Sequence, residues 1–521
     1  MYCVIGSGPA AISAASALAQ RNLPVCIVDT ALRRREVDRL LRQKFAAGEP
    51  ESWATDELAE LKSRTVANAH GVEKKLDFGS DHVYQQLPVA PDLEIRDATV
   101  LRSFARGGLS NVWGASILPY PDDELDSWPI DGTELGEHYR AVLEFVPQSG
   151  ADDCLSELFP SAGENMQSMP RSTQHVSLLR DLERARESLE ESGIRFGTAR
   201  LAVDAEGKSS GSHCRRCGLC LYGCPYGLIY SASTTLEDLI ERDNVDYRPG
   251  LWVQSLQRDG GKLRLRATNT VSGHEESLVA DRVFLAAGVA ETARIVLTSM
   301  EQVGVPVLGL HSDRITLPLL RFKRDRGIRS EAVHTLSQVF LELRDESICE
   351  EMIHVQIYGY NDLYPESLAA RLRRFGIHRS RKAYDILLER LMVAFAYLHS
   401  RLSSKIEYVL AADGQLRITG KPSGEARTAS RLLASKLRRN GLRFGALFGN
   451  PNLHLPGGGN HSGGTFPMTA SPGPLQCDSF GELRGLPNLH IVDSSVLPSL
   501  SSTTITLPAM ANAHRIASEV S

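Results

Sequence analysis

The chain of 521 residues is 42% hydrophobic and 23% charged, an ordinary composition for a folded protein that is too long for one simple core. Its formal net charge of -5 gives no reason to expect a nucleic-acid partner. No apolar run approaches the roughly 18 residues of a membrane-spanning helix. We expect two closely connected domains, and a cytoplasmic protein because an apolar strand begins at Tyr2 and leaves no room for a leader.

The first 29 residues predict a strand, a tight turn, a helix and a second strand, as in a dinucleotide-binding unit. The turn carries G-x-G-x-x-A: Gly6 permits the turn, Gly8 lets backbone amides approach a pyrophosphate, and Ala11 lets the helix pack closely on the strand. Asp29, at the end of the second strand, can accept hydrogen bonds from ribose hydroxyls. The fingerprint does not distinguish FAD from NAD, although its N-terminal position favours FAD.

The most specific motif is the run CRRCGLCLYGCP at 214–225, which contains four of the nine cysteines. Its spacing, C-x2-C-x2-C-x3-C-P, is the one by which bacterial ferredoxins hold an iron–sulfur cluster, because two-residue gaps aim successive thiolates at one cluster. The pattern therefore predicts a cluster whose ligands are Cys214, Cys217, Cys220 and Cys224.

Other uses of this cysteine run stay open. Zinc sites commonly consist of two C-x2-C pairs separated by a dozen or more residues, which fits the spacing poorly, and disulfides are rare in a reducing cytosol. Zinc, another metal and unligated thiols are the alternatives. If all four thiolates reach one cluster, we expect [4Fe-4S]; otherwise the first three bind [3Fe-4S] or take a remote fourth ligand. The candidates for that ligand are Cys154, Cys349 and Cys477.

Three further segments resemble the glucose–methanol–choline (GMC) oxidoreductases, a family of FAD enzymes. RGGLSNVWGASILPY, at 106–120, is similar to the family's glycine-rich flavin segment. VFLAAGVAETARIVLTS, at 283–299, resembles the strand, glycine and helix that close its nucleotide domain. NHSGGTFPM, from 460 onward, is similar to the family's H-x-x-G-T-x-x-M, and residues 488–517 resemble its C-terminal signature. The segments occur in family order.

The resemblance implies a fold class of α/β with an α+β substrate domain. We expect a Rossmann-like FAD-binding domain of the GMC type, an antiparallel-sheet substrate domain and a cysteine-cluster loop. The expected boundaries are FAD-binding parts at 1–120, 236–305 and 450–521 (the last also catalytic), a cap part of the substrate domain at 121–205, the cluster loop at 206–235 and the substrate-binding domain at 306–449.

The resemblance also implies residue roles. His461 falls where the family keeps its catalytic base, which takes the proton of the substrate hydroxyl as hydride passes to flavin N5. The family's second histidine or asparagine is replaced by Ser502 or Thr503, whose hydroxyls are poor bases, so His514 or another residue is the alternative. The residues expected to bind FAD are Gly6, Gly8, Pro9, Ala10, Ala11, Asp29, Arg106, Gly107, Gly108, Ser110, Asn111, Val112, Trp113, Gly114, Ala287, Gly288, Asp493, Ser494 and Thr504.

One departure from the family concerns how the flavin is attached. Relatives that bind flavin covalently carry a histidine just before the tryptophan of the middle segment. Here Val112 precedes Trp113, so we expect non-covalent, dissociable FAD.

Together these motifs predict an FAD-dependent dehydrogenase that oxidises a hydroxyl group of a small-molecule or glycan alcohol, such as a sugar, glycoside or other polyol. Electrons would leave one at a time through the cluster to an external acceptor, a ferredoxin-like protein or a quinone. The alternatives are a cluster-fed flavin reductase of a double bond and a non-catalytic electron-transfer or redox-sensing flavoprotein. The basic run and apolar helical stretch at 371–402 is a candidate for peripheral contact with the inner membrane surface, although a solvated helix is the commoner case.

Overall fold

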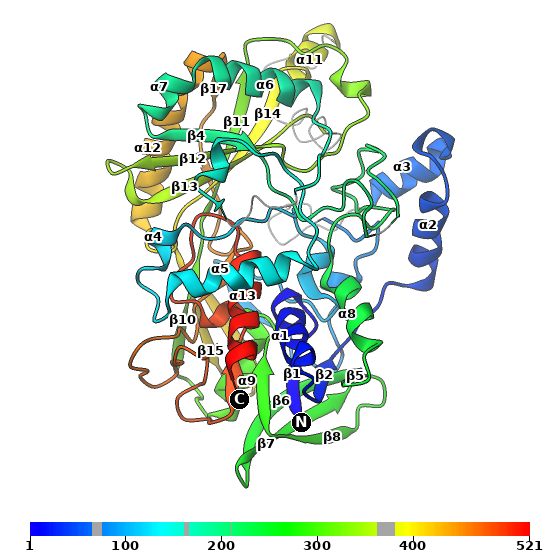
Figure 1. Ribbon diagram of the computed structural model, residues 1–521, viewed down its shortest axis with the longest axis vertical. Coiled ribbons are helices and arrows are strands. Elements are labelled where there is room, and N and C mark those ends of the chain that lie inside the picture. The colour runs from blue at the N-terminus through cyan, green and yellow to red at the C-terminus, as the bar shows by residue number, and fades with distance from the viewer. Residues whose placement is uncertain (65–74, 161–165, 210, 362–380, 521) are drawn as a thin grey trace.

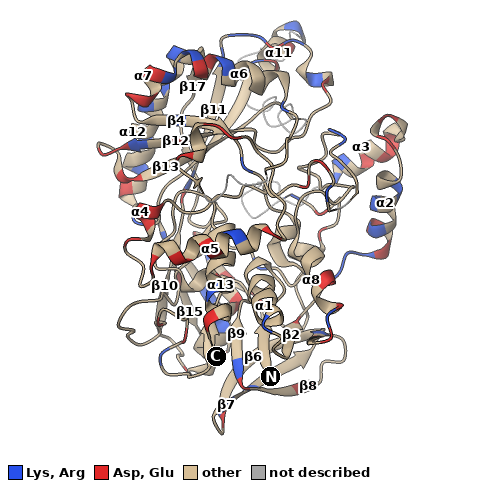
Figure 2. Ribbon diagram, viewed as in Figure 1, with Lys and Arg blue, Asp and Glu red and all other residues tan. Residues whose placement is uncertain are grey.

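The computed structural model describes residues 1–64, 75–160, 166–209, 211–361 and 381–520. Figure 1 shows a lower part that holds both marked termini and an upper part in which helices cover one large sheet. No helix in these described ranges is long and apolar enough to cross a membrane. Lys, Arg, Asp and Glu are interspersed along the outer helices (Figure 2), as the modest net charge leads us to expect.

The lower part is built on a five-stranded parallel sheet with the order β20-β9-β1-β2-β5. Small residues of α1 pack closely on this sheet, and α8 and α13 complete the same apolar cluster. The carboxyl ends of β1, β2 and β9 meet at one edge, where dinucleotides bind in such sheets. The elements are β1 (Tyr2–Ile5), α1 (Pro9–Gln20), β2 (Val25–Asp29), α8 (Ala232–Ile240), β5 (Val245–Pro249), β9 (Arg282–Leu285), α9 (Val289–Ser299), β20 (Leu489–Ile491) and α13 (Thr506–Glu519).

The upper part contains an antiparallel sheet with the order β17-β11-β14-β13-β12-β4, beside which β18 pairs with β11. Alternate apolar side chains of these strands bury against α6, α7 and α12, which leaves the other face of the sheet for the interior of the molecule. The alternating runs at 337–345 and 352–360 predict strands, and the structure confirms them as β12 and β13. The elements are α6 (Thr173–Arg184), α7 (Arg186–Glu190), β4 (Ile194–Thr198), β11 (Arg314–Arg321), β12 (Val339–Asp345), β13 (Cys349–Tyr358), β14 (Leu391–Tyr397), α12 (Gly424–Gly441), β17 (Ala446–Phe448) and β18 (Asn452–Leu453).

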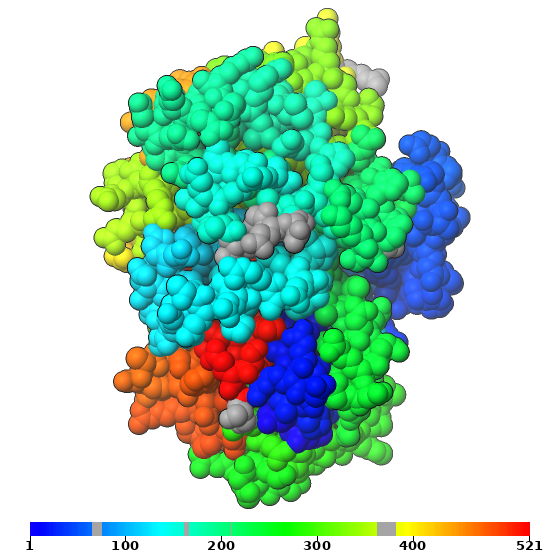
Figure 3. Space-filling model, viewed as in Figure 1, coloured from blue at the N-terminus to red at the C-terminus, as the bar shows by residue number. Residues whose placement is uncertain are grey.

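Two further sheets and the helices α4 and α5 complete the fold. One sheet has the order β19-β10-β15-β16-β3, and the other is the antiparallel meander β6-β7-β8. The segment around α5 lies between the upper part and the α1–α13 pair (Figure 3). The elements are β3 (Glu94–Arg96), α4 (Asp122–Leu125), α5 (Gly132–Leu143), β6 (Leu251–Asp259), β7 (Lys262–Asn269), β8 (Glu275–Ala280), β10 (Pro306–His311), β15 (Lys405–Leu410), β16 (Leu416–Lys421) and β19 (Ser462–Gly463).

A helix pair, α2 (Glu36–Ala46) and α3 (Thr55–Ser63), projects from one side of the molecule (Figure 1). Phe45 of α2 packs with Leu61 of α3 and with Leu219 of the cysteine run. Trp53, between the helices, stacks on Tyr226 with ring centroids 6.3 Å apart. The helix pair therefore covers the loop that carries the four cysteines.

The segment at 371–402 does not form one amphipathic helix. Residues 371–380 lie outside the described residues, and α11 (Arg381–Leu388) is a short helix. Leu391–Tyr397 is strand β14, which pairs with β11 on one side and β13 on the other. The helix prediction is wrong for 391–397 because alternate residues of this run are buried against α12, which is the period of a strand.

Candidate active site

A cavity of about 960 Å³ extends from the N-terminus of α1 to the inner face of the seven-stranded sheet. Most of the residues expected to contact FAD or substrate line it. These are Gly6, Gly8, Pro9, Ala10, Asp29, Gly108, Ser110, Val112, Trp113, Gly114, Ala287, Gly288, His461, Asp493, Ser494 and Thr504. An elongated cavity of this size suits an extended dinucleotide and a small substrate.

Gly6 and Gly8 shape the turn between β1 and α1. Gly6 has φ of +109°, and a Cβ on it would lie 2.4 Å from the carbonyl oxygen of Ala286, so only glycine fits. Gly8 precedes α1 and offers no side-chain cap, and nothing lies within 4 Å of its Cβ position. The amides of the first turn of α1 therefore open onto the cavity at the positive end of the helix dipole, an arrangement that fits a pyrophosphate.

Asp29 places a buried carboxylate at the end of β2. The Ser7 hydroxyl donates a hydrogen bond to it at 2.6 Å and the Tyr247 hydroxyl donates another at 3.3 Å. Burial raises the pKa of Asp29 to about 6, against the opposing effect of these hydrogen bonds. Because a carboxylate can accept further hydrogen bonds, this group suits the ribose hydroxyls of FAD.

The segment 106–114 is held against the turn at Gly6. The amide of Gly107, where φ is +81°, donates to the Ser7 hydroxyl at 2.9 Å. Lys75 donates from Nζ to the carbonyl oxygen of Trp113 at 2.7 Å, which fixes the far end of the segment. These contacts bring Val112 and Trp113 to the cavity. The glycine-rich segment 106–114, which the resemblance implies contacts the flavin, thus contributes to the cavity wall.

Four of the residues predicted to bind FAD do not line the cavity: Ala11, Arg106, Gly107 and Asn111. Ala11 is fully buried in α1. The Asn111 side chain donates to the carbonyl oxygens of Arg106 at 2.9 Å and Gly108 at 2.7 Å, so it shapes the turn itself. Direct contact of these residues with FAD stays a prediction.

Asp493 ties the C-terminal segment to the start of α9. One carboxylate oxygen accepts hydrogen bonds from the Gly288 amide at 2.9 Å and from the Thr292 hydroxyl at 2.6 Å. The other accepts from the Ser495 amide at 2.9 Å. Burial raises the pKa of Asp493, whereas these donors lower it. The carboxylate thereby fixes the turn at 493–495 beside the cavity.

His461 lies on the cavity wall with its ring stacked on Tyr397, at a centroid distance of 5.0 Å and an interplanar angle of 22°. Its Nδ1 atom is buried and has no hydrogen-bond partner within the described part of the chain. Burial lowers the pKa of His461 to about 3, with His354 and Arg314 as further causes. The imidazole is therefore neutral at neutral pH and can accept a proton from a substrate hydroxyl.

The seven-stranded sheet contributes a wall that sequence reasoning did not identify. Its strands place Arg314 of β11 opposite Tyr397 of β14, which in turn lies opposite His354 of β13. Period-two alternation was the available signal, but it does not show which face of a sheet meets a cavity. The sheet residues that line the cavity are Arg314, Gln356, Tyr358, Phe395, Tyr397, Asn452 and Leu453.

Ser502 and Thr503 are fully buried behind the cavity wall, to which Thr504 belongs. Their hydroxyls have no hydrogen-bond partner among the residues that the structure describes. The alternative residue, His514, does not line the cavity and contacts His138 of α5, with their Nδ1 atoms 2.9 Å apart. A catalytic role for any of these residues stays a prediction.

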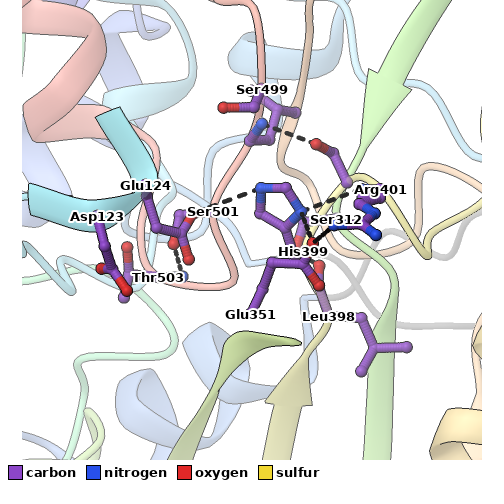
Figure 4. A network of polar contacts seen from close by, with 12 residues as sticks. Asp123, Glu124, Ser312, Glu351, Leu398, His399, Arg401, Ser499, Ser501 and Thr503 are labelled. Atoms are coloured by element: carbon purple, nitrogen blue, oxygen red, sulfur yellow. Dashed lines mark hydrogen bonds and ion pairs between the residues drawn. The ribbon is translucent and has the colours of Figure 1, made fainter. Parts of the chain in front are cut away.

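A network of polar contacts anchors the loop that contains Ser502 and Thr503 (Figure 4). Glu124 of α4 contacts His399, with 3.4 Å between Oε2 and Nε2, and Ser501 hydrogen-bonds the same carboxyl group. Burial raises the pKa of Glu124 to about 8 and lowers that of His399 to about 4. Both groups are therefore mainly uncharged at pH 7, so the contact between Glu124 and His399 that anchors the loop is one between neutral side chains.

The four cysteines of the run at 214–225 occupy a partly buried loop between β4 and α8, and all four are free thiols. Burial and the neighbouring Cys220 raise the pKa of Cys214 to about 11, and burial also raises the pKa of Cys217 and Cys220, with other thiols of the run as further causes. The thiols thus share one electrostatic environment. Within the described ranges, however, no three His, Cys, Asp or Glu side chains are arranged to hold a metal ion.

Comparison with known proteins adds the family. Residues 452–513 match the family model for the C-terminal part of the GMC oxidoreductases. This segment is similar to the C-terminal part of a GMC oxidoreductase. It contains His461 and Asp493, so the match covers the side chain on the cavity wall and the carboxylate that fixes the adjoining turn. No curated protein sequence matches the chain significantly.

Solved structures share the whole fold of the chain. Pyridoxine 4-oxidase from Mesorbium loti is 14% identical with a TM-score of 0.53, over 99% of this chain and 98% of that one. Formate oxidase is 14% identical with a TM-score of 0.56, over 99% of this chain and 97% of that one. The predicted fold class is confirmed. Together with the C-terminal match, these shared folds support an oxidoreductase that acts on CH–OH donors.

Proposed function

We propose that this chain is an FAD-dependent dehydrogenase that oxidises a hydroxyl group of a sugar, glycoside or other polyol, with His461 as the base. The observation that carries the proposal is the neutral His461 imidazole, which lies on one cavity with the open N-terminus of α1. Stacking on Tyr397 orients the imidazole ring on the cavity wall, where it can accept the hydroxyl proton of a substrate.

The residues around the turn at Gly6 fit FAD. The amides that follow Gly8 suit the pyrophosphate, Asp29 suits the ribose, and the segment 106–114 suits the flavin ring. When bound, FAD supplies the hydride acceptor of the reaction. Val112 carries no group that could form a covalent flavin link, which supports dissociable FAD.

The cysteine loop is proposed to hold an iron–sulfur cluster that gives the enzyme a one-electron outlet to a ferredoxin-like protein or a quinone. The spacing of the thiols supports this, as does their placement in one loop without disulfides. Lys75 also supports it, because Cys220 and Cys224 affect the pKa of the same ammonium that donates to the carbonyl oxygen of Trp113. Lys75 thus lies on the cavity wall within the electrostatic influence of two thiols of the cysteine loop.

The test uses protein purified without oxygen. We expect flavin absorption that is released by acid, and iron and acid-labile sulfide in similar amounts. An added alcohol should bleach the flavin bands, and an artificial one-electron acceptor should sustain turnover faster than oxygen does. Stoichiometric hydrogen peroxide with oxygen alone would instead indicate an oxidase, as the names of pyridoxine 4-oxidase and formate oxidase describe those two proteins. Bleaching only by reduced ferredoxin would contradict alcohol oxidation.

A further inference from the structure

The cationic side chains that line the cavity differ in what they bind. Arg102 pairs with the buried Glu291 at 3.1 Å, and Arg64 pairs with Asp38 at 2.9 Å. Arg314 has no carboxylate partner among the residues that the structure describes. It is therefore a positive charge whose natural counter-ion is absent from the described protein.

The acidic residues of the cavity wall do not provide that counter-ion. Asp29 accepts hydrogen bonds from the hydroxyls of Ser7 and Tyr247. Asp493 accepts hydrogen bonds from the backbone amides of Gly288 and Ser495. Glu291, the third, is bound by arginine on both oxygens. The guanidinium of Arg314 thus lies on the cavity wall without a carboxylate from the described protein, in a position where a substrate could supply one.

The geometry around Arg314 suits recognition of a planar anion. Its guanidinium lies 5.2 Å from the centre of the Phe395 ring, donates to the Tyr397 hydroxyl, and reaches His454 only weakly, at 3.5 Å from Nη2 to Nδ1. Its Nε atom has no partner within the described chain. Five N–H donors in a fixed plane are thus only partly used, and a fork of this kind binds carboxylate through two parallel hydrogen bonds.

Arg314 is also close to the proposed base. The positive charge is one of the causes that lower the pKa of His461, and Tyr397 contacts both residues. We propose that Arg314 binds an anionic group of the substrate, so that the enzyme oxidises hydroxy acids or other acidic polyols in preference to neutral ones. This inference rests on the proposed alcohol oxidation and adds the substrate class.

Pairing at Arg314 would have a second effect on the reaction. An anion bound there offsets the charge that depresses the basicity of His461, so the imidazole becomes a better proton acceptor when an acidic substrate is present. A neutral substrate would bind without that gain. We therefore expect acidic and neutral substrates to differ mainly in KM and to a smaller extent in kcat.

The first experiment compares gluconate, gluconamide and sorbitol 6-phosphate as substrates of the FAD-loaded enzyme and its Arg314→Gln variant. We expect kcat/KM for gluconate to exceed that for gluconamide, and to fall about 100-fold in the variant, the effect of one charge-assisted pair. The kcat/KM for gluconamide should change less than threefold in the same variant. Arg314→Lys should retain part of the kcat/KM for gluconate that Arg314→Gln loses. Preference for the phosphate ester, lost in the same variant, would identify phosphate as the recognised anion.

The control is Arg417→Gln, which removes an exposed arginine of β16 that pairs with Glu94 of β3. This variant should have the wild-type kcat/KM for all three substrates. Equal losses for acid and amide in Arg314→Gln, or loss of bound FAD, would overturn the proposal, since the arginine would then serve the fold or the cofactor.

A binding measurement separates this inference from the proposed function. Hexanoate and hexanamide cannot react at a hydroxyl, so their binding, followed by perturbation of the flavin spectrum, is independent of turnover. If no alcohol reduces the flavin but hexanoate binds more tightly than hexanamide only when Arg314 is present, the anion site stands and alcohol oxidation fails. Equal binding of the two in both proteins would refute the anion site.

Discussion

Replacing His461 by Gln tests whether the imidazole is the base. The side chain is about as long, retains hydrogen-bonding groups and cannot take up a proton at neutral pH. Loss of a general base costs about 100- to 10,000-fold in rate. Because burial lowers the pKa of His461 to about 3, the imidazole is a weak base, and we expect the lower part of this range, about 100- to 1,000-fold in kcat. That loss corresponds to about 3 to 4 kcal/mol in activation free energy.

The assay is anaerobic reduction of the bound flavin by substrate in a stopped-flow spectrometer, which reports the chemical step directly. FAD content should not change in the variant, because the turn at Gly6 and the segment 106–114 are intact. The control is His274→Ala, at an exposed turn after β7, which should behave as wild type. Flavin reduction within threefold of wild type in His461→Gln would refute the assignment of the base.

The pH dependence gives a second readout of the same residue. An ordinary histidine would protonate near pH 6.5 and stop the reaction below it. With the pKa of His461 lowered to about 3 by burial, kcat/KM should stay level between pH 5 and 8 and fall only below about pH 4. An acid limb near pH 6.5 that disappears in His461→Gln would show that the base titrates normally and that its burial does not act as argued.

Three further predictions concern the rest of the molecule. Gly6→Ala should lose FAD binding and about 3 kcal/mol of unfolding free energy, measured by denaturant titration, because the Cβ would meet Ala286 at positive φ; retention of tightly bound FAD would contradict this. Cys217→Ser should lose most of its iron and sulfide in chemical assays while Cys154→Ser keeps both; iron loss in both variants would indicate a remote ligand. Glu124 has a folded pKa raised by burial to about 8, above its unfolded value, so its contribution to stability is present at low pH and is lost as the pH rises through 8. Relative to Glu124→Gln, wild type should lose roughly 3 to 5 kcal/mol of unfolding free energy between pH 4.5 and 8, and parallel stability curves for the two proteins would contradict the shift.

The parts of the site that depend on local chemistry could be predicted from the sequence. Gly6 and Gly8 are dictated by a backbone turn and a helix N-terminus, and Asp29 by the end of the adjoining strand. Each is specified by residues within a short distance along the chain, so a motif is enough to find it. The same holds for His461, which lies in a short motif of recognisable composition.

The parts that depend on which surfaces meet could not be predicted in this way. Arg314 reaches the cavity because β11 lies beside β14 and one face of their sheet turns inward, and no local pattern reports that. Leu391–Tyr397 was predicted to be helical because an apolar run fits either period until its pairing partners are known. The order of residues in a motif predicts Ser502 at the site; its side chain is fully buried next to Thr504 of the cavity wall, and its role stays a prediction.

The position of α13 has a consequence for biosynthesis. Ser13 of α1 donates to the carbonyl oxygen of Met510, and Arg21 donates to those of Ala517 and Val520, so the first helix is completed by residues about 500 positions later (Figure 3). A ribosome adding roughly 5 to 20 residues per second would leave α1 without this partner for tens of seconds. During that time a nascent chain exposes an apolar helix and an unfinished nucleotide sheet. Flavin loading should therefore follow release of the finished polypeptide, and chaperones that bind exposed apolar helices should protect the chain until then.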